Sequence, residues 1–245
     1  MIKGIYKAAS GMVPRMKKQE ITANNIANAS TPGFKKESTF IKELDSATKS
    51  ILPKKSDWQT PMIDQIYTDY SQGTFNKTGN PLDVAIDGEG FFVLENVDGD
   101  DRQYSRNGSF SVDPEGFLIS SSGYRVMGEG GPIEAAGGMI EINESGELMI
   151  DGNTTNRLQI VNFEDKNILG KVGSSGFVAQ GDSEPLPAVG FSVRQGYLEN
   201  SNINVIKEMV GMIITLRNFE TGAKMIQTQD ESLKTLFTQV GKTQM

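Results

Sequence analysis

A run of acidic residues is the first candidate for chemistry in this 245-residue chain. Asp98, Asp100 and Asp101 lie in the run VDGDDR, and closely spaced carboxylates are ligands that Ca²⁺ prefers. An EF-hand loop that opened at Asp98 would need Asp or Asn where Arg102 stands and Glu where Ser109 stands. The run is therefore predicted to be a solvated hairpin tip and not a calcium site.

Two further patterns could bind a ligand or support catalysis. The run GEGG at 128–131 could cradle a phosphate, but it precedes Pro132 and lacks the strand, loop and helix order that such a site needs. Two carboxylates could also hydrolyse a glycosidic bond, and the middle of the chain is rich in candidates: Asp83, Asp87, Glu89, Asp113 and Glu115. Most of these stand beside Gly or Pro in expected turns, where turn formation and solubility explain them.

The composition removes most other kinds of active site. The chain has no Cys and no His, which excludes disulfides, thiolate metal sites and imidazole catalysis. A net charge of −7, with basic residues gathered only in short pairs such as Lys17–Lys18 and Lys35–Lys36, argues against nucleic acid as a partner. We expect no enzymatic activity, no cofactor and no metal.

The strongest pattern in the chain is a heptad stripe in its last forty residues. Apolar residues alternate steps of four and three, with Asp230 as the polar exception: Val205, Met209, Met212, Leu216, Phe219, Ala223, Ile226, Asp230, Leu233, Phe237 and Val240. This spacing predicts a long helix whose stripe must be covered by another helix. Asp230 either fixes the register with that partner or meets water where the partner ends, and both interpretations stay open. Gly211 and Gly222 cost such a helix about 1 kcal/mol each, which is tolerable if they allow another backbone to come close.

A weaker stripe of the same kind opens the chain. Its members are Ile2, Ile5, Ala9, Met12, Met16, Ala23 and Ile26, and the turn formers NASTPG at 28–33 end it. Pro14 predicts a kink, or a helix that is regular only after it. We expect the two terminal helices to pair as a coiled coil, to pack against neighbouring copies, or both.

Everything between the two stripes is typical of Gly-rich β structure. Residues 35–80 read as an extended connector with a short strand at 63–67, and alternation of apolar residues begins at Leu82. The segments 109–120 and 139–150 each predict a β-hairpin, and 158–163 and 176–179 add strands. The expected fold class is α+β, with paired terminal helices and a central antiparallel β-barrel or sandwich.

The expected division of the chain follows from these patterns: an N-terminal helix at 1–34, an extended connector at 35–80, a β domain at 81–187, a return connector at 188–202 and a C-terminal helix at 203–245. No apolar run approaches the ~20 residues of a membrane span. The opening MIKGIYKAASGM lacks the apolar stretch of a cleaved signal peptide. These rules alone predict a cytoplasmic protein.

Five blocks of the sequence resemble one known family. NNIANASTPGFK at 24–35 is similar to the N-terminal signature of bacterial flagellar rod and hook proteins. LDVAIDGEGFFVL, YSRNGSFSVDPEGFL, GYLENSNIN and EMVGMIITLRNFE resemble that family's later blocks, in the same order and across nearly the whole chain. The residues that carry the signature are Asn24, Asn25, Asn28, Pro32, Gly33, Phe34, Gly196, Leu198, Glu199, Ser201 and Asn202.

The resemblance implies a structural subunit of the flagellar basal-body rod. Such a subunit is exported unfolded through the flagellar type III apparatus without a cleaved signal, so it would lie in the periplasmic rod and not in the cytoplasm. Its terminal helices would form the inner core of a helical tube that transmits torque from motor to hook, with the β domain facing outward. Its partners would be copies of itself, other rod proteins, hook-side axial proteins and the export apparatus, without insertion into a membrane.

Two details bear on the position within the rod. The segment 35–82 is short and lacks the Gly-rich patch that distal rod members usually carry there, and VMGEGGPI at 126–133 resembles proximal rod members. The proximal rod is therefore favoured and the distal rod is the alternative. A hypothesis from another class, motivated by the acidic β region, is an exported protein that binds or cleaves cell-wall glycan; absence of both binding and release from peptidoglycan would exclude it.

Overall fold

The computed structural model describes residues 2–44, 60–97, 101–135, 138–181 and 184–242, with side chains for all of these except 2–8, 40–44, 60–65 and 240–242. The chain forms two compact units, and each is described by itself. The helical unit comprises residues 1–27, 37–69 and 204–245. The β unit comprises residues 28–36 and 70–203.

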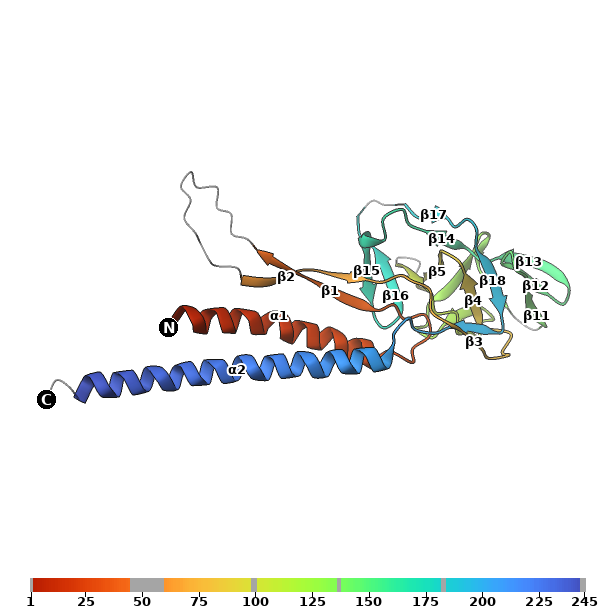
Figure 1. Ribbon diagram of the computed structural model, residues 1–245. Helices are drawn as coiled ribbons and strands as arrows, with labels where there is room; N and C mark the ends of the chain where they lie inside the picture. The colour runs from red at the N-terminus through yellow and green to blue at the C-terminus, as the bar shows by residue number, and fades with distance from the viewer. Residues whose placement is uncertain (1, 45–59, 98–100, 136–137, 182–183, 243–245) are drawn as a thin grey trace. The chain divides into compact units, whose positions relative to one another are not determined.

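The helical unit is built on two long helices, α1 (Ile2–Ala27) and α2 (Val205–Lys242), which pack along one another (Figure 1). They run antiparallel, since Met12 lies against Gly222 and the Arg15 guanidinium donates to the carbonyl oxygen of Asn218, at 2.9 Å. Strands β1 (Glu37–Leu44) and β2 (Thr60–Thr68) pair as an antiparallel ribbon that also contacts α1. The connector expected at 35–80 thus contains a ribbon of which only the strand near 63–67 was predicted.

The ends of both helices follow from local chemistry. The Asn204 side chain accepts a hydrogen bond from the Lys207 amide at 3.0 Å and so caps α2, and Glu208 places a negative charge in its positive first turn. Beyond α1, the Thr31 amide donates to the Asn28 carbonyl oxygen in the turn that stops the helix. Of the two alternatives expected at Pro14, the helix that is regular only after it is wrong, because α1 is one continuous helix across that buried residue. The kink stays a prediction.

The β unit contains one large antiparallel sheet of ten strands. Seven strands follow the order β15 (Leu169–Val172), β16 (Gly176–Ala179), β6 (Arg102–Ser105), β5 (Phe91–Glu95), β9 (Arg125–Gly128), β8 (Leu118–Ser120) and β7 (Phe110–Val112). Strand β10 (Gly131–Pro132) pairs with β9, and β14 (Ile160–Asn162) pairs with both β5 and β17 (Leu186–Pro187). Strands β15 and β7 end the path without pairing with each other, so the described strands do not form a closed barrel, one of the two arrangements that were expected.

Three smaller sheets and one short helix complete the β unit. They are β11 (Ile140–Ile142), β12 (Glu147–Ile150) and β13 (Asn153–Arg157); β4 (Val84–Asp87) with β18 (Ser192–Gln195); β3 (Phe75–Lys77) with β19 (Tyr197–Glu199); and the 3₁₀ helix η1 (Lys166–Ile168). Both predicted hairpins are confirmed, as β7 with β8 and β11 with β12. Gly116 and Gly146 stand in their turns with φ of 93° and 82°, values that favour glycine.

The core of the β unit consists of two apolar clusters on opposite sides of β5. Phe92 belongs to a cluster of aliphatic residues with Val84, Leu118 and Leu148. Its neighbour Phe91 belongs to an aromatic cluster, where its ring lies 5.7 Å from that of Phe177. Adjacent residues of a strand point to opposite faces, so one short apolar run serves both clusters.

We predict different effects of the same substitution at the two glycines of α2. A Cβ atom at Gly222 would lie 3.3 Å from Cγ of Met12, whereas nothing lies within 4 Å at Gly211. Gly211→Leu should stabilise the helical unit by up to about 1 kcal/mol through helix propensity. Gly222→Leu should lose that gain to overpacking, which costs ~1–3 kcal/mol. Thermal unfolding followed by circular dichroism measures both; equal stabilisation would contradict the close approach at Gly222.

Candidate interaction surface

In the first part of α2, the most deeply buried residues on the side that faces α1 are small or polar. Thr215 and Glu208 are buried there, Gly222 is buried against Met12, and Gly211 is partly covered. The larger aliphatic residues of the first three turns lie on the opposite side and are exposed. In this part of α2, small and polar residues therefore contact α1, and larger aliphatic residues are exposed on the opposite side.

The heptad stripe of α2 lies between these two sides. A seven-residue repeat drifts by ~20° per heptad on a helix of 3.6 residues per turn. Accordingly Met209 and Leu216 are exposed, while later members of the stripe, Ile226 and Leu233, are partly covered. Val205, Met212, Phe219 and Ala223 are also partly covered, and the side chain of Val240 lies outside the described residues.

Two further members of the stripe, Asp230 and Phe237, are also exposed to water. Asp230 is exposed and forms an ion pair with Lys234 at 2.8 Å, which favours the interpretation that its part of the stripe faces solvent in this chain. Phe237 is 75% exposed. In an antiparallel pair in which Met12 is level with Gly222, α1 starts near the level of residue 232, so α2 extends beyond it at Phe237.

The stripe predicted on α1 is not the side that α1 buries. Ala9, Met16 and Ala23 are exposed, Met12 and Ile26 are partly covered, and the side chains of Ile2 and Ile5 lie outside the described residues. The buried residues are Pro14, Ile21, Thr22 and Asn25. Sequence periodicity missed this side because Thr and Asn do not read as apolar.

Asn25 is the signature residue that joins α1 to the ribbon. Its side-chain amide donates to the carbonyl oxygen of Glu37 at 2.8 Å, and its side-chain oxygen accepts from the Glu37 amide at 3.0 Å. Both groups of the buried side chain are thereby paired with the backbone of β1. Neighbouring Asn24 is exposed.

In the β unit a buried carboxylate holds together the segments where the chain enters and leaves. Glu199 is 0% exposed, and one of its carboxylate oxygens accepts from Lys35 Nζ at 2.6 Å and from the Gly73 amide at 2.9 Å. The other carboxylate oxygen accepts from Arg106 Nη1 at 3.3 Å. We call Lys35, Arg106 and Glu199 the charged clasp; its residues are distant in sequence and almost fully buried.

The cations of the clasp have further partners. Lys35 also donates to the Ser71 carbonyl oxygen at 2.8 Å, and Arg106 Nη2 donates to the Gly88 carbonyl oxygen at 2.8 Å. Burial lowers the pKa of the Arg106 guanidinium, and the Glu199 charge opposes that shift. A guanidinium stays protonated at neutral pH even so, and the network therefore holds two cations around one anion.

Several signature residues pack around the clasp. Gly33 has a φ of 68°, its amide donates to the Glu199 carbonyl oxygen at 2.7 Å, and a Cβ atom there would lie 2.3 Å from the Asn107 nitrogen. Phe34 is buried under Lys171 Nζ, which lies 3.6 Å from the centre of its ring. Asn202 accepts from the Lys36 amide at 2.8 Å.

The remaining signature residues lie in the same two segments. Ser201 is buried, Asn28, Pro32, Gly196 and Leu198 are partly covered, and Gly196 has a φ of 77°. Lys35 and Arg106 were not singled out from the sequence. The available signal for Arg106 was its position in YSRNGSF, where it is the one charged residue in a stretch next to a predicted strand. A charged residue in such a stretch can indicate a buried ion pair.

The carboxylates weighed for chemistry serve turns and ion pairs. Asp113 accepts from the Phe117 amide in the β7–β8 turn, and Asp87 pairs with Arg194. Hydrogen bonds from Lys166 and Asn162 lower the pKa of the Glu89 carboxyl, which opposes a role as general acid. Within the described part of the chain, no group of three or more acidic residues could hold a metal ion; Asp98 and Asp100 lie outside it.

The other two candidates also have structural partners. Asp83 accepts from the Asn80 side chain at 3.1 Å, and Glu115 pairs with Arg125. The GEGG run forms the turn between β9 and β10, where the Asn156 side chain accepts from the Gly130 amide at 3.2 Å. This turn leads to a strand and not to a helix, in agreement with the argument against a phosphate site.

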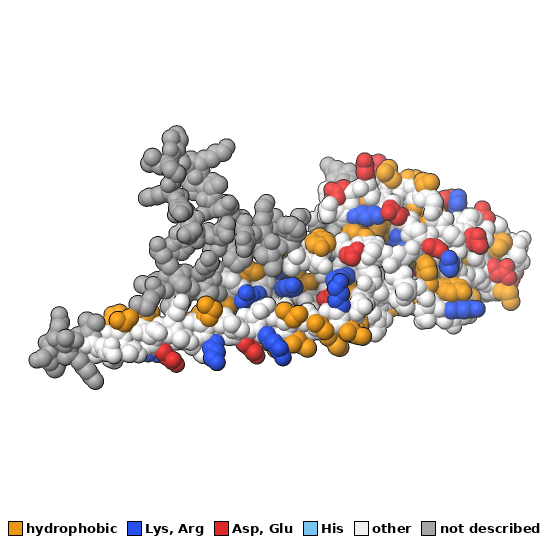
Figure 2. All heavy atoms as spheres, in the orientation of Figure 1, with side chains coloured by type: hydrophobic (Ala, Val, Ile, Leu, Met, Phe, Trp, Pro, Cys, Tyr) orange, Lys and Arg blue, Asp and Glu red, His pale blue; other side chains and the backbone are white. Residues whose placement is uncertain are grey.

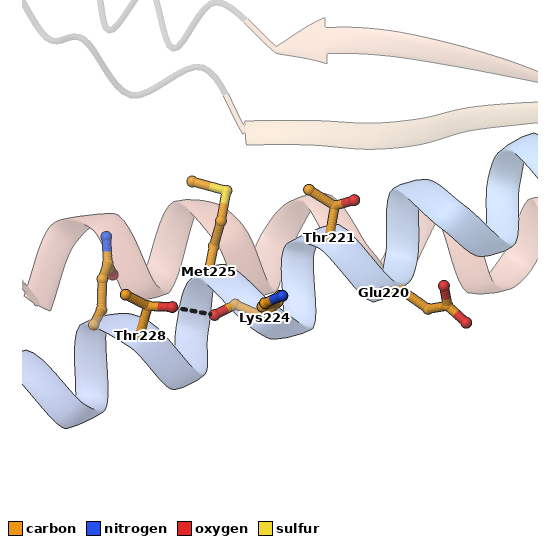
Figure 3. A pocket seen from close by; sticks show the side chains of 6 residues that line it. Glu220, Thr221, Lys224, Met225 and Thr228 are labelled. Carbon is orange, nitrogen blue, oxygen red and sulfur yellow. Dashed lines mark hydrogen bonds between the residues drawn. The ribbon is translucent and has the colours of Figure 1, made fainter.

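A shallow groove of about 550 Å³ lies on α2 (Figure 3). The residues that line it are Glu220, Thr221, Lys224, Met225, Thr228 and Gln229. Thr228 uses its hydroxyl to donate to the Lys224 carbonyl oxygen at 2.9 Å. The groove combines one exposed Met with polar side chains, and its chemistry suits contact with another protein surface better than a cofactor.

Three families of known proteins match separate segments of this chain, one in each terminal helix and one in the β unit. The family described as flagella basal body rod protein matches residues 5–35, the flagellar hook protein FlgE/F/G D1 domain matches 85–160, and the flagellar basal body rod FlgEFG protein C-terminal family matches 194–238. These three segments contain most of α1, much of the β unit and most of α2.

Individual relatives align over almost the whole chain. The flagellar basal-body rod protein FlgF of Caulobacter vibrioides is 29% identical over 99% of both chains. The flagellar basal-body rod protein FlgG of Bacillus subtilis is 30% identical over 96% of this chain and 98% of its own. FlgG of Agrobacterium fabrum is 32% identical over 91% of this chain and 94% of its own.

A chain with this organisation and these relatives is a structural subunit of the bacterial flagellum. It belongs to the flagellar basal-body rod protein family and is FlgF-like, a part of the rod that assembles with other rod and axial proteins. Among the described helices, none is long and apolar enough to cross a membrane.

We predict that Glu199→Gln destabilises the chain by ~3–5 kcal/mol, because it removes the one buried carboxylate charge that Lys35 and Arg106 both contact. Urea unfolding of the full chain measures the loss. Glu89→Gln is the matched control, since this exposed ion pair should contribute only ~0–1 kcal/mol. A Glu199→Gln chain within 1 kcal/mol of the control would show that the clasp does not stabilise the β unit.

Proposed function

We propose that this chain is a proximal rod subunit whose copies, together with other rod proteins, assemble into a helical tube that transmits torque from motor to hook. The observation that carries the proposal is the large apolar face of α2 that the described part of the chain leaves exposed. Support for the proximal position comes from the short segment 35–82 and from full-length similarity to a FlgF protein. A distal, FlgG-like position is the alternative, and the similarly high identity of FlgG relatives does not favour it.

We assign roles to the parts of the chain on the same basis. Residues 1–34 and 203–245 form the axial core, in which α1 and α2 act as a coiled coil. Residues 35–80 and 188–202 are connectors, and the β domain at 81–187 faces outward. The predicted stripes on both helices would form the contacts between neighbouring subunits. The signature residues near the C-terminal end of α1 and before the N-terminal end of α2 would determine the geometry of these contacts.

The assembly mode follows from symmetry. A contact that joins two different surfaces of identical subunits generates an open helical array unless its rotation closes a ring. Rod subunits need only such contacts and perform no chemistry in this proposal. The subunit is placed in the periplasmic part of the basal body after export through the flagellar apparatus without a cleaved signal peptide.

Removal of 203–245 tests the proposal. The truncated chain keeps the charged clasp but lacks α2 and all of its apolar surface, so it should be missing from isolated rods, and cells that depend on it should be non-motile. Immunoblots of purified basal bodies and swimming assays measure the two effects. The full-length Glu89→Gln chain is the control and should enter rods normally. Truncated chains that enter rods and restore swimming would refute the assignment.

A further inference from the structure

Six large aliphatic residues cover the outer side of the first three turns of α2. They are Ile206, Met209, Val210, Ile213, Ile214 and Leu216, and each is 42–76% exposed. On a helix of 3.6 residues per turn they lie within an arc of roughly 160°, centred opposite Glu208 and Thr215, the buried residues that face α1. We call this set the outer patch; Figure 2 shows hydrophobic side chains gathered along this part of α2.

The outer patch is as large as the largest apolar patches found on typical monomers. Its six side chains expose on the order of 600 Å², and the largest apolar patch on a typical monomer is about 300–600 Å². A standard protein interface buries about 800 Å² on each partner. One partner of ordinary size would therefore be enough to cover the outer patch.

The outer patch ends abruptly. From Arg217 onward the exposed side of α2 carries mainly charged and polar residues, among them Glu220, Thr221 and Lys224. The apolar stretch is thus about 16 Å long, at 1.5 Å per residue over residues 206–216. A partner that covered the whole length of α2 in the same way would bury those charges, so the contact is limited to the first part of the helix.

A second, smaller apolar patch lies on α1. Val13 and Met16 are 66% and 51% exposed and stand one turn apart, away from the buried residues Pro14 and Ile21. The ion pair of Lys17 and Glu20 lies beside them. We call Val13 and Met16 the α1 patch.

The two patches of one chain lie at different levels of the helix pair. Arg15 is level with Asn218, so the α1 patch lies roughly 12 Å along the helix axis from the centre of the outer patch near residue 211. A contact between the outer patch of one copy and the α1 patch of another joins two different surfaces and leaves one of each free. Such a head-to-tail contact propagates.

We propose that the outer patch of α2 binds the α1 patch of a second copy of this chain. The partner is a second copy because the same helical unit offers both apolar surfaces, flanking one helix pair, and neither covers the other. Met16 and Met209 adapt in shape more readily than branched residues, which suits a contact repeated along a curved array. The proposal rests on the proposed function only for the premise that copies of this chain meet.

The absence of cysteine from the chain makes the contact measurable by disulfide trapping. A full-length chain carrying both Met16→Cys and Ile213→Cys should give a ladder of dimers, trimers and larger species under mild oxidation. Each single variant can reach only a dimer and should form at least tenfold less cross-linked product. In the control, Thr228→Cys replaces Ile213→Cys and places the thiol on the polar part of α2, so it should give no ladder.

Val210→Asp adds a second readout. This exposed residue should not be needed for folding, and the change should abolish the ladder of the doubly substituted chain while circular dichroism stays unchanged. No ladder from the doubly substituted chain would overturn the proposal, as would an Ile213→Cys dimer more abundant than the ladder, which would mean that two outer patches meet. The presence of the unmodified chain in isolated rods is scored separately. A chain found in rods but giving no ladder refutes this contact alone, whereas its absence from rods refutes the proposed function.

Discussion

The distribution of side-chain size around α2 is the constraint on which the helical unit depends. On the side that meets α1, Gly222 lies against Met12 and Thr215 is buried, so small residues of α2 let the two helices lie close at these positions. Close approach on one side leaves the larger residues, such as Ile206 and Ile213, on the other. Apolar surface exposed to water is unfavourable at ~25 cal/mol per Å², and the chain on its own has no described element that covers it. The tendency to assemble is thus a consequence of how the helix pair is built.

The charged clasp gives the β unit a defined point of entry and exit. Glu199, which lies just before α2, pairs with Lys35, the last residue of the first signature block, and with Arg106, which follows β6. Next to these ion pairs, the Gly33 amide donates a hydrogen bond to the Glu199 carbonyl oxygen. The two segments that lead to the helices are therefore fixed next to each other by the β unit itself. Removing one member of such a buried ion-pair network is generally costly, so we expect these three residues to depend on one another.

Much of the fold could be predicted from the sequence because its signals are local. The stop at Asn28–Gly33 and the two hairpins around Gly116 and Gly146 depend on a few neighbouring residues, and the structure confirms them. Of the two expected arrangements, barrel or sandwich, the barrel was wrong, because closure depends on long-range pairing between β15 and β7, which no local pattern encodes. The heptad stripe predicted a long helix correctly. Its members are only partly on the covered side, because a seven-residue repeat drifts around a straight helix.

In the candidate site, too, residues with a local sequence signal could be predicted, whereas those defined by long-range contacts could not. The signature blocks pointed to Asn25, Gly33 and Glu199 by resemblance, but their partners became visible only in three dimensions. Lys35 and Arg106 were missed because a buried cation looks like any surface cation until its counter-ion is located. The outer patch was missed for a related reason: Ile206, Val210 and Ile213 fall off the heptad positions on which the helix was predicted.

The central claim is that apolar helix surfaces exposed in the free chain become covered when subunits assemble. Oxidation of the natural methionines by dilute peroxide, read by mass spectrometry, tests it without any substitution. Met16 and Met209 should oxidise readily in the free chain, where they are 51% and 49% exposed, and should be protected in isolated rods. Equal oxidation of both residues in the two states, or protection of both already in the free chain, would contradict the account.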